Sequence, residues 1–370
     1  MSNNMSLENT KTLKWREVYS LAALNAAVVI SWIAYHEYQP VLMENLGITH
    51  LVDFLIIAKA IILVTIPPLA GWLADRIMKK NGKYMVIFTV GIGATAMVFM
   101  VVATLIGTSH IMDVSGIIPF MIVIWLICMN LFISPANSMI EAFAPAKQLP
   151  IVVGVLFLVT ELLYALEPVV VALVTFFGDT LTFVVGGILI GGTGYIFHRV
   201  SRDEVLQRKA DLMKDDRVKS QSMMSYIAIL VVGLLLGVGK AFIVEFLPEY
   251  FAENFASFQL SGSIISFSIL GICAIGGFLI SRKIAKVNLR KVLISSFIVL
   301  FVGVLLLIFS GNVYLSIVSA LIIGAAFTIM NIGGLPFAIQ NLSVRHVTYG
   351  VGIYIGASEV ITGLFEYLYQ

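Results

Sequence analysis

The sequence reads Gly71-Trp-Leu-Ala-Asp75-Arg76-Ile-Met78-Lys79-Lys80-Asn-Gly-Lys83-Tyr84 directly after its second long apolar segment. A shorter version, Gly277-Phe-Leu-Ile-Ser281-Arg-Lys283, follows the second apolar segment of the later part of the chain. Both versions read Gly, aromatic, Leu, any residue, Asp or Ser, Arg, and then further basic residues. Two copies at matching positions predict a chain built from two related halves, which is a frequent plan among transporters.

The positive charges on either side of these segments follow a regular pattern. Of the 23 Lys and Arg residues, 21 lie in the N-terminal tail or in every second connection between apolar segments, and only Lys59 and Lys240 lie inside such segments. The alternate connections hold no Lys or Arg, and they lie near 39–50, 108–116, 177–180, 248–257 and 311–312. This is the positive-inside pattern of a multi-pass membrane protein. It predicts an integral protein of the cell membrane with a cytosolic N-terminus.

Composition supports a membrane protein and argues against several other classes. The chain is 59% hydrophobic and 12% charged, whereas soluble domains carry about 25% charged residues. The apolar runs are too long and too uniform for barrel strands, so an all-α fold is expected. Because the basic residues stay close to the membrane, nucleic-acid binding is not expected.

Eleven apolar segments are long enough to span a bilayer, which takes about 20 residues. They are expected near 18–38, 51–74, 84–107, 117–141, 149–176, 181–198, 223–247, 258–281, 291–310, 313–340 and 347–369. The long polar stretch at 199–222 divides them. We therefore expect a six-helix bundle over 1–198, a cytosolic linker over 199–222, and a second bundle over 223–370 with five helices.

The segment that starts at Gly71 resembles the loop signature of the major facilitator superfamily, with Met78 in place of the second glycine. A weaker resemblance to the glycoside–cation symporter branch, which includes sucrose–proton symporters, lies in Leu46–His50 and in Asn130–Glu141. The superfamily resemblance implies two six-helix bundles around a central cavity and transport by alternating access. It also implies twelve helices, so the second bundle is expected to lack its last helix.

Ionisable side chains inside membrane spans are costly, and each is therefore a candidate for function. The candidates for substrate binding and proton coupling are Lys59, Glu161, Lys240 and Glu359. The resemblance implies that their helices line or flank the cavity. A buried carboxylate can load a proton on one side and release it on the other, while Lys240 could hold such a carboxylate or bind an anionic substrate. A static ion pair that only helps the helices to pack is the alternative for each of them.

A second group of candidates lies at the cytosolic ends of the helices. The resemblance implies that Gly71, Asp75 and Arg76 belong to a gating latch. Asp75 is expected to meet a helix N-terminus, where the backbone dipole is positive, and Arg76 is expected to pair with Glu141. The neighbouring lysines are more simply explained as anchors to lipid headgroups.

Other kinds of site are not expected. Cys128 and Cys273 lie in apolar runs and are interpreted as buried hydrophobes. The five histidines are expected at helix ends or in loops, and none has metal-ligand spacing. Neither a nucleophile–base arrangement nor a cofactor motif is present, so the chain is not expected to be an enzyme or to bind a metal or cofactor. Asn331–Pro336 is expected either to break the tenth helix at a binding site or only to kink it.

These observations predict a monomeric secondary active transporter, embedded in membrane lipid, that moves a small polar solute by alternating access. A sugar-like solute and coupling to protons, or to another cation, are the first expectations. A drug or organic-anion exporter of the same fold is one alternative. A membrane sensor of transporter ancestry that does not transport is another.

Overall fold

The computed structural model describes the chain except for residues 1–11, 82–84, 109–113, 208–221, 255–261 and 369–370. The described residues form helices and connections without a strand, and eleven helical segments are long and apolar enough to cross a membrane. The expected all-α membrane architecture is thus confirmed. The first set of helices is α2 (Trp15–Asn45), η1 (Thr49–Leu51), α3 (Val52–Asn81), α4 (Val86–Thr108), α5 (Ile118–Leu131), α6 (Ile133–Ser138), α7 (Ile140–Phe143), η2 (Ala146–Gln148), α8 (Leu149–Ala165) and α9 (Glu167–Val200). The second set is α11 (Met223–Ala241), η3 (Phe242–Phe246), α12 (Leu247–Asn254), α13 (Gly262–Ile284), α14 (Leu289–Ile308), α15 (Val313–Gln340) and α16 (Val347–Leu368).

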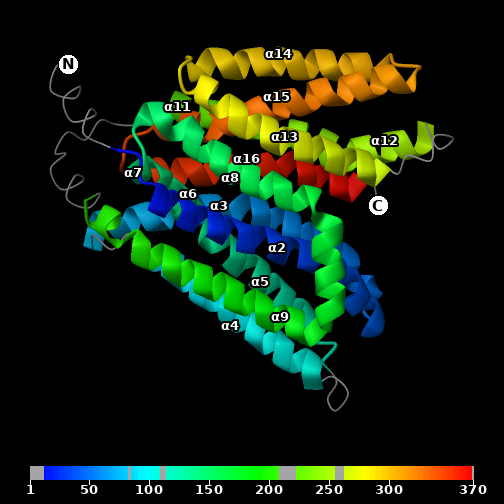
Figure 1. Ribbon diagram of the computed structural model, residues 1–370. Helices are drawn as coiled ribbons and strands as arrows, with labels where there is room; N and C mark the ends of the chain where they lie inside the picture. The colour runs from blue at the N-terminus through cyan, green and yellow to red at the C-terminus, as the bar shows by residue number, and fades with distance from the viewer. Residues whose placement is uncertain (1–11, 82–84, 109–113, 208–221, 255–261, 369–370) are drawn as a thin grey trace.

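The two sets lie side by side with their long helices running roughly parallel (Figure 1). Across the boundary, α16 packs along α3 and α13 packs along α8. We call the end of the molecule with the Lys- and Arg-rich connections the basic end, and the opposite end the acidic end. The elements at the boundary therefore come from the second, fifth, eighth and eleventh membrane spans.

Three spans expected as single helices are interrupted. The fourth, expected over 117–141, is divided into α5, α6 and α7. Pro135 has no N–H to donate to the carbonyl of Leu131, where α5 ends. The fifth, expected over 149–176, is interrupted at Leu166, two residues before Pro168. The seventh, expected over 223–247, changes at Phe242 into the π-helical turn η3 and continues as α12 to Asn254.

The chain reverses direction at Gly178, inside the range assigned to α9. Its φ of 71° is left-handed and suits glycine. Near this kink, the carbonyl of Val174 accepts hydrogen bonds from the hydroxyls of Tyr38 (2.8 Å) and Thr182 (3.1 Å). A buried backbone carbonyl thus stays satisfied, and α2 is tied to the turn between the fifth and sixth spans.

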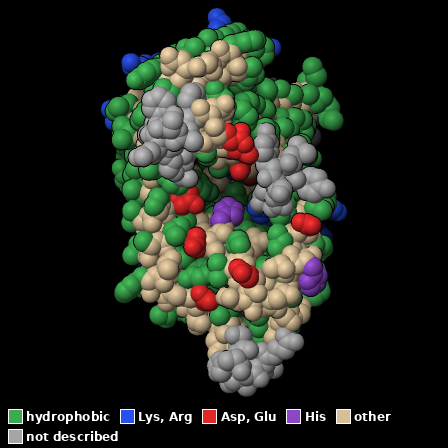
Figure 2. Space-filling view, turned by 90° about the vertical axis from the view of Figure 1, so that its right-hand side faces the viewer, with side chains coloured by type: hydrophobic (Ala, Val, Ile, Leu, Met, Phe, Trp, Pro, Cys, Tyr) green, Lys and Arg blue, Asp and Glu red, His purple; other side chains and the backbone are tan. Residues whose placement is uncertain are grey.

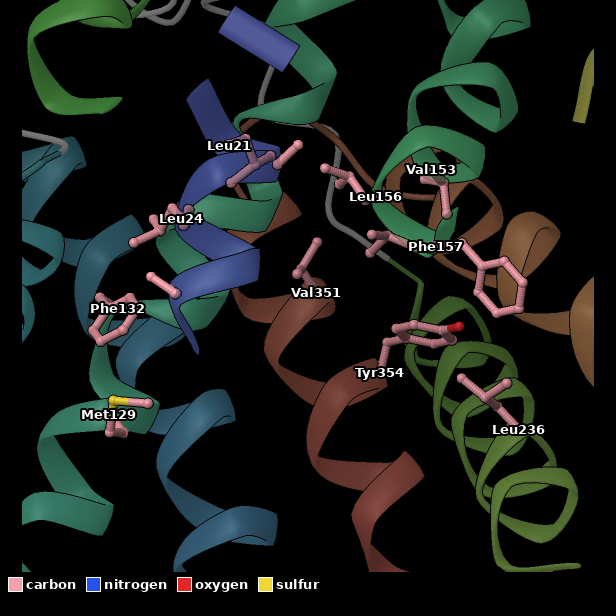
Figure 3. Packing of buried hydrophobic residues seen from close by; sticks show 14 of the residues in the cluster. Leu21, Leu24, Met129, Phe132, Val153, Leu156, Phe157, Leu236, Val351 and Tyr354 are labelled. Carbon is pink, nitrogen blue, oxygen red and sulfur yellow. The ribbon is translucent and has the colours of Figure 1, made fainter. Parts of the chain in front are cut away.

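Buried apolar side chains join the two sets near the boundary. Figure 3 shows Leu156 and Phe157 of α8 near Val351 and Tyr354 of α16, with Leu236 of α11 beside them. The Phe157 ring lies 5.8 Å from that of Phe327 in α15. Many large apolar side chains on α14 are exposed instead, as expected for a surface that faces acyl chains: Ile294, Ile298, Phe301, Val302 and Ile308.

Candidate functional site

The acidic end is hollowed between the two sets of helices. Figure 2 views the molecule from the side of α12 and shows a central depression ringed by acidic side chains, with histidine and basic side chains inside it. Because polar groups in a membrane protein are tolerated where they line water-filled space, this cavity is the candidate functional site.

Lys240 and Glu359 form an ion pair at this site. The Lys240 Nζ lies 2.9 Å from Oε1 and 3.0 Å from Oε2 of Glu359, so both carboxylate oxygens accept from one ammonium group. The side chains are 33% and 18% exposed, respectively. Part of each charged side chain thus remains accessible, although both residues lie well inside their spans.

Two glycines set the position of Lys240 against α16. A Cβ at Gly233 would lie 2.6 Å from the Tyr354 carbonyl oxygen, and one at Gly237 would lie 2.5 Å from that of Ser358. Side chains at these positions would keep the helices apart. The four-residue spacing of small residues thus allows close backbone contact and brings Lys240, less than one turn further on, opposite Glu359.

Glu161 approaches the same ammonium group from the other set. It lies on α8 and is only 6% exposed. Within the described residues it makes no hydrogen bond or ion pair, but it lies within Coulombic range of Lys240. Tyr164, one turn away on α8, is close enough to interact with Lys240, Glu161 and Glu359. Three of the four predicted residues, Glu161, Lys240 and Glu359, are thus brought together across the boundary.

His36 is a member of the site that the sequence did not suggest. It was expected at the end of a helix, because the first span was expected over 18–38. Instead, α2 continues past Pro40 to Asn45, so His36 lies well inside the helix. Its exposed ring is 5.9 Å from that of Trp32 and 5.5 Å from that of Tyr35.

Lys59 is the fourth predicted residue. It is 5% exposed on α3 and interacts electrostatically with His36, as does Lys240. The site therefore combines two cationic side chains, an imidazole and two carboxylates, drawn from five helices. None of this forms a metal centre, since the described part of the chain contains no group of three His, Cys, Asp or Glu residues that could hold an ion.

A separate small cavity of about 40 Å³ lies within the first set of helices. Its walls come from α2, α4, α5 and α9, and include Tyr35, Tyr38, Phe99 and Trp125. None of the four predicted ionisable residues lines it, so it contributes nothing to the charged site.

The basic end is closed by contacts between α3 and the start of α16. A Cβ at Gly71 would lie 2.3 Å from the Thr348 carbonyl oxygen. One turn on, the backbone N–H of Tyr349 donates to Oδ2 of Asp75 at 2.9 Å. Tyr349 is in the first turn of α16, where N–H groups lack helical partners. Asp75 thus meets a helix N-terminus, and that helix belongs to the opposite set.

Arg76 and Glu141 do not form the expected pair. The Arg76 guanidinium carbon instead lies 5.1 Å from the centre of the Trp72 ring. These two residues are one turn apart on α3, so a local cation–π contact replaces the predicted long-range one. A different bond joins the sets near this end, from Nε2 of Gln340 to the carbonyl of Ala146 (2.8 Å).

The second copy of the motif occupies the matching place at the other boundary contact. A Cβ at Gly277 would lie 2.7 Å from Phe157, and one at Gly154 would lie 2.5 Å from the Cβ of Ser281. Gly71 and Asp75 contact α16, while Gly277 and Ser281 contact α8. Ser281 is fully buried and its hydroxyl bonds to Phe278 in its own helix, so this contact lacks the charged cap that Asp75 provides.

His346 lies beside the closed contact, one residue before α16. The Tyr226 hydroxyl is 2.9 Å from its Nδ1. Burial, followed by the positive charges of Lys79 and Arg345, lowers the pKa of His346 below its ordinary value. Lys79 belongs to the opposite set. If the basic end opens during transport, its repulsion is relieved, and we expect the open state to bind a proton at His346 more readily than the closed state does.

Acidification should consequently weaken closure. Since the pKa of His346 is lower in the closed state, closure is fully stable above about pH 6.5 and is weakened as the pH falls below it. We expect the distance between spin labels at Lys80 and Lys286, both exposed at the basic end, to lengthen between pH 7.5 and 5.5. His346→Gln keeps a hydrogen-bonding side chain without the titration and should remove this response. An unchanged response would assign it to another group.

Comparisons with known proteins agree with this geometry. The family model described as Major Facilitator Superfamily matches residues 18–365. No curated protein matches the sequence. The fold is similar to that of the human organic anion transporter MFSD10 (TETRAN), with a TM-score of 0.67 and 12% identity over 95% of this chain and 92% of that one. It is also similar to the MFS proton:xylose symporter XylE, with a TM-score of 0.61 and 12% identity over 95% and 88% of the two chains.

At this identity the two structures establish the fold alone, and the resemblance to the glycoside–cation branch is not confirmed. The family match, however, extends over nearly the whole chain and includes both boundary contacts and the charged site. The protein is therefore a member of the major facilitator superfamily.

Proposed function

We propose that the protein is a secondary active transporter that moves a small polar solute by alternating access, with coupling to protons. The observation that carries the proposal is the ion pair of Lys240 and Glu359 in a cavity open at one end, with Glu161 facing it from the opposite set. If the sets rock as two bundles while no solute is bound, the distance between Glu161 and Lys240 changes and the distance between Lys240 and Glu359 is retained. A proton on Glu161 would then be stabilised in one state and released in the other.

The latch has a place in the same cycle. We propose that Gly71 and Asp75 hold the basic end closed while the acidic end is open, and that Arg76 and Glu141 lie outside this contact. The positive-inside rule supports placing the basic end in the cytosol of a cell with this transporter in its plasma membrane. The state described here then faces outward.

Two classes of solute have support. A sugar-like solute could stack on the half-buried Trp32, whose ring lies 5.9 Å from that of His36. An organic anion is favoured by the positive charges of Lys240 and Lys59, and MFSD10, whose fold is similar, is an organic anion transporter. Both classes are compatible with proton coupling.

Glu161→Gln tests the coupling. In proteoliposomes with an imposed pH gradient, we expect the wild-type protein to accumulate at least one solute from a panel of labelled sugars and organic anions. The variant should lose gradient-driven accumulation by at least about tenfold, the usual effect of removing an essential proton-transfer group, while exchange without a gradient continues. Glu167→Gln, a carboxylate change on the neighbouring helix, serves as the control. Unaltered accumulation in Glu161→Gln would exclude Glu161 from coupling, and no accumulation by the wild type would favour a sensor.

A further inference from the structure

The charge balance at Lys240 restricts what the cavity can bind. Lys240 has one described counter-ion, Glu359, and a second carboxylate, Glu161, lies within Coulombic range. An ammonium group has three donors, and its partial exposure leaves room for a ligand on the cavity side. A ligand carboxylate at this position would face two protein carboxylates around a single ammonium group. Because unbalanced charge inside a membrane span is costly, such a ligand can bind only if one negative charge is removed.

We propose that the solute is a monovalent organic anion whose carboxylate takes the place of Glu359 on Lys240, and that Glu359 takes up one proton from water as it is displaced. This inference rests on the proposed transport function and names its substrate class. The exchange is balanced, since one Lys–carboxylate pair is broken, one is formed, and the added negative charge is neutralised by the proton. Transport of the loaded site would then carry no net charge.

Glu359 is the group best placed to take this proton. It has no partner among the described residues other than Lys240, so it is left without a counter-ion once the ligand carboxylate binds. Glu161 already lacks a hydrogen bond or ion pair before the ligand enters, so its surroundings change less. Both Glu359 and Lys240 are accessible from the cavity, whereas Glu161 is buried.

Other titratable groups also face this position. They are Glu161 and Tyr164 on α8, His36 on α2, which interacts with Lys240, and Lys59 on α3, which interacts with His36. His36 is the main competitor for the proton because its side chain is exposed. Two positive neighbours, Lys59 and Lys240, oppose its protonation. An anion bound to Lys240 would reduce the repulsion from Lys240, but the repulsion from Lys59 would remain.

The binding of acetate, lactate and benzoate to the purified full chain tests the proposal, with acetamide, lactamide and benzamide as uncharged counterparts of nearly the same shape. Calorimetry in buffers of different ionisation enthalpy gives the Kd and the number of protons taken up. At least one anion should bind with the uptake of about one proton, its amide should not bind, and the anion Kd should rise with pH by up to about tenfold per unit, as linkage to one proton requires. Failure of all three anions to bind, or equal binding of an amide, would overturn the proposal.

Glu359→Gln separates Glu359 from its competitors. It keeps the shape and a hydrogen bond to Lys240 but carries no charge. We expect its anion Kd to be independent of pH between 6 and 8 and no weaker than the wild-type value at pH 6. Asp203→Asn, a change at an exposed carboxylate of the basic end, should keep the wild-type pH dependence, and His36→Gln and Glu161→Gln are measured beside it. Loss of that dependence in His36→Gln or Glu161→Gln, or its persistence in Glu359→Gln, would contradict the assignment.

The two proposals can fail separately. Proton-linked anion binding without accumulation in proteoliposomes would refute transport and leave the binding mechanism standing. Gradient-driven accumulation of a neutral solute without anion binding would refute the binding mechanism and leave the proposed transport function standing.

Discussion

Replacing Gly352 with valine should hold the basic end open and reduce transport by at least about tenfold. A Cβ at Gly352 would lie 2.3 Å from the Pro67 carbonyl oxygen and 2.8 Å from the Cα of Pro68. Both are backbone atoms of α3 and cannot rotate away. One turn on, a Cβ at Gly356 would lie 2.5 Å from the Val64 carbonyl oxygen. Overpacking costs about 1–3 kcal/mol, and here the cost falls on the closed state alone.

That cost corresponds to a shift of about 5- to 150-fold in the ratio of open to closed basic ends. The spin-label distance between positions 80 and 286 should lengthen in Gly352→Val, and uptake should fall in parallel. Gly276→Val is the matched control, because a Cβ at Gly276 would meet nothing within 4 Å. If Gly352→Val transported at the control rate, close contact between α3 and α16 would not be part of the cycle.

Asp75→Asn should shift the same equilibrium through electrostatics. The negative charge of Asp75 stabilises the first turn of α16 in the closed state and loses this interaction when the ends separate. Interactions of a carboxylate with a helix N-terminus contribute about 0.3–1 kcal/mol at a surface and up to about 2 kcal/mol when partly buried. Since Asp75 is buried, we expect a cost near the upper end of this energy range. The ratio of open to closed basic ends should then rise roughly 10- to 30-fold.

Asn keeps an oxygen that can accept from the Tyr349 N–H, so the variant removes the charge without removing the acceptor. Accessibility of the basic end to a membrane-impermeant thiol reagent, read at a cysteine introduced for Val351, gives the population of the open state. Val351 is fully buried in the closed state. Asp203→Asn, a surface carboxylate after α9 at the same end, provides the control. Equal labelling of the two variants would show that Asp75 is not a latch.

Much of the fold could be predicted because lipid imposes strong rules on sequence. Apolar length and one-sided positive charge sufficed to find the eleven spans, and the motif beginning at Gly71 identified the family. The boundaries within the spans were harder to predict. The first span was expected to end near residue 38, yet α2 continues through Pro40 to Asn45, since neighbouring helices and water can satisfy the carbonyl that a proline frees inside a membrane protein.

The candidate site was predictable in part for the same reason. Charges inside spans are rare, so Glu161, Lys240 and Glu359 stood out before any geometry was known. Their pairing was not predictable, because it depends on the rotation of α11 and α16 that the contacts of Gly233 and Gly237 determine. His36 was missed because the end of its helix was misplaced. The contact of Arg76 with Trp72 could have been predicted from their four-residue spacing on one helix, whereas the prediction followed the family resemblance and paired Arg76 with Glu141.

The π-helical turn after Lys240 changes the direction in which the side chains of α12 point relative to those of α11. A π turn holds one more residue than an α turn, and each α-helical residue advances the face by about 100°. Deleting a single residue from 242–246 would therefore rotate the side chains of α12, including its acidic ones, about the helix axis, while the position of Lys240 stays unchanged. In such a span, the selectivity of the entrance and the chemistry of the centre can diversify independently.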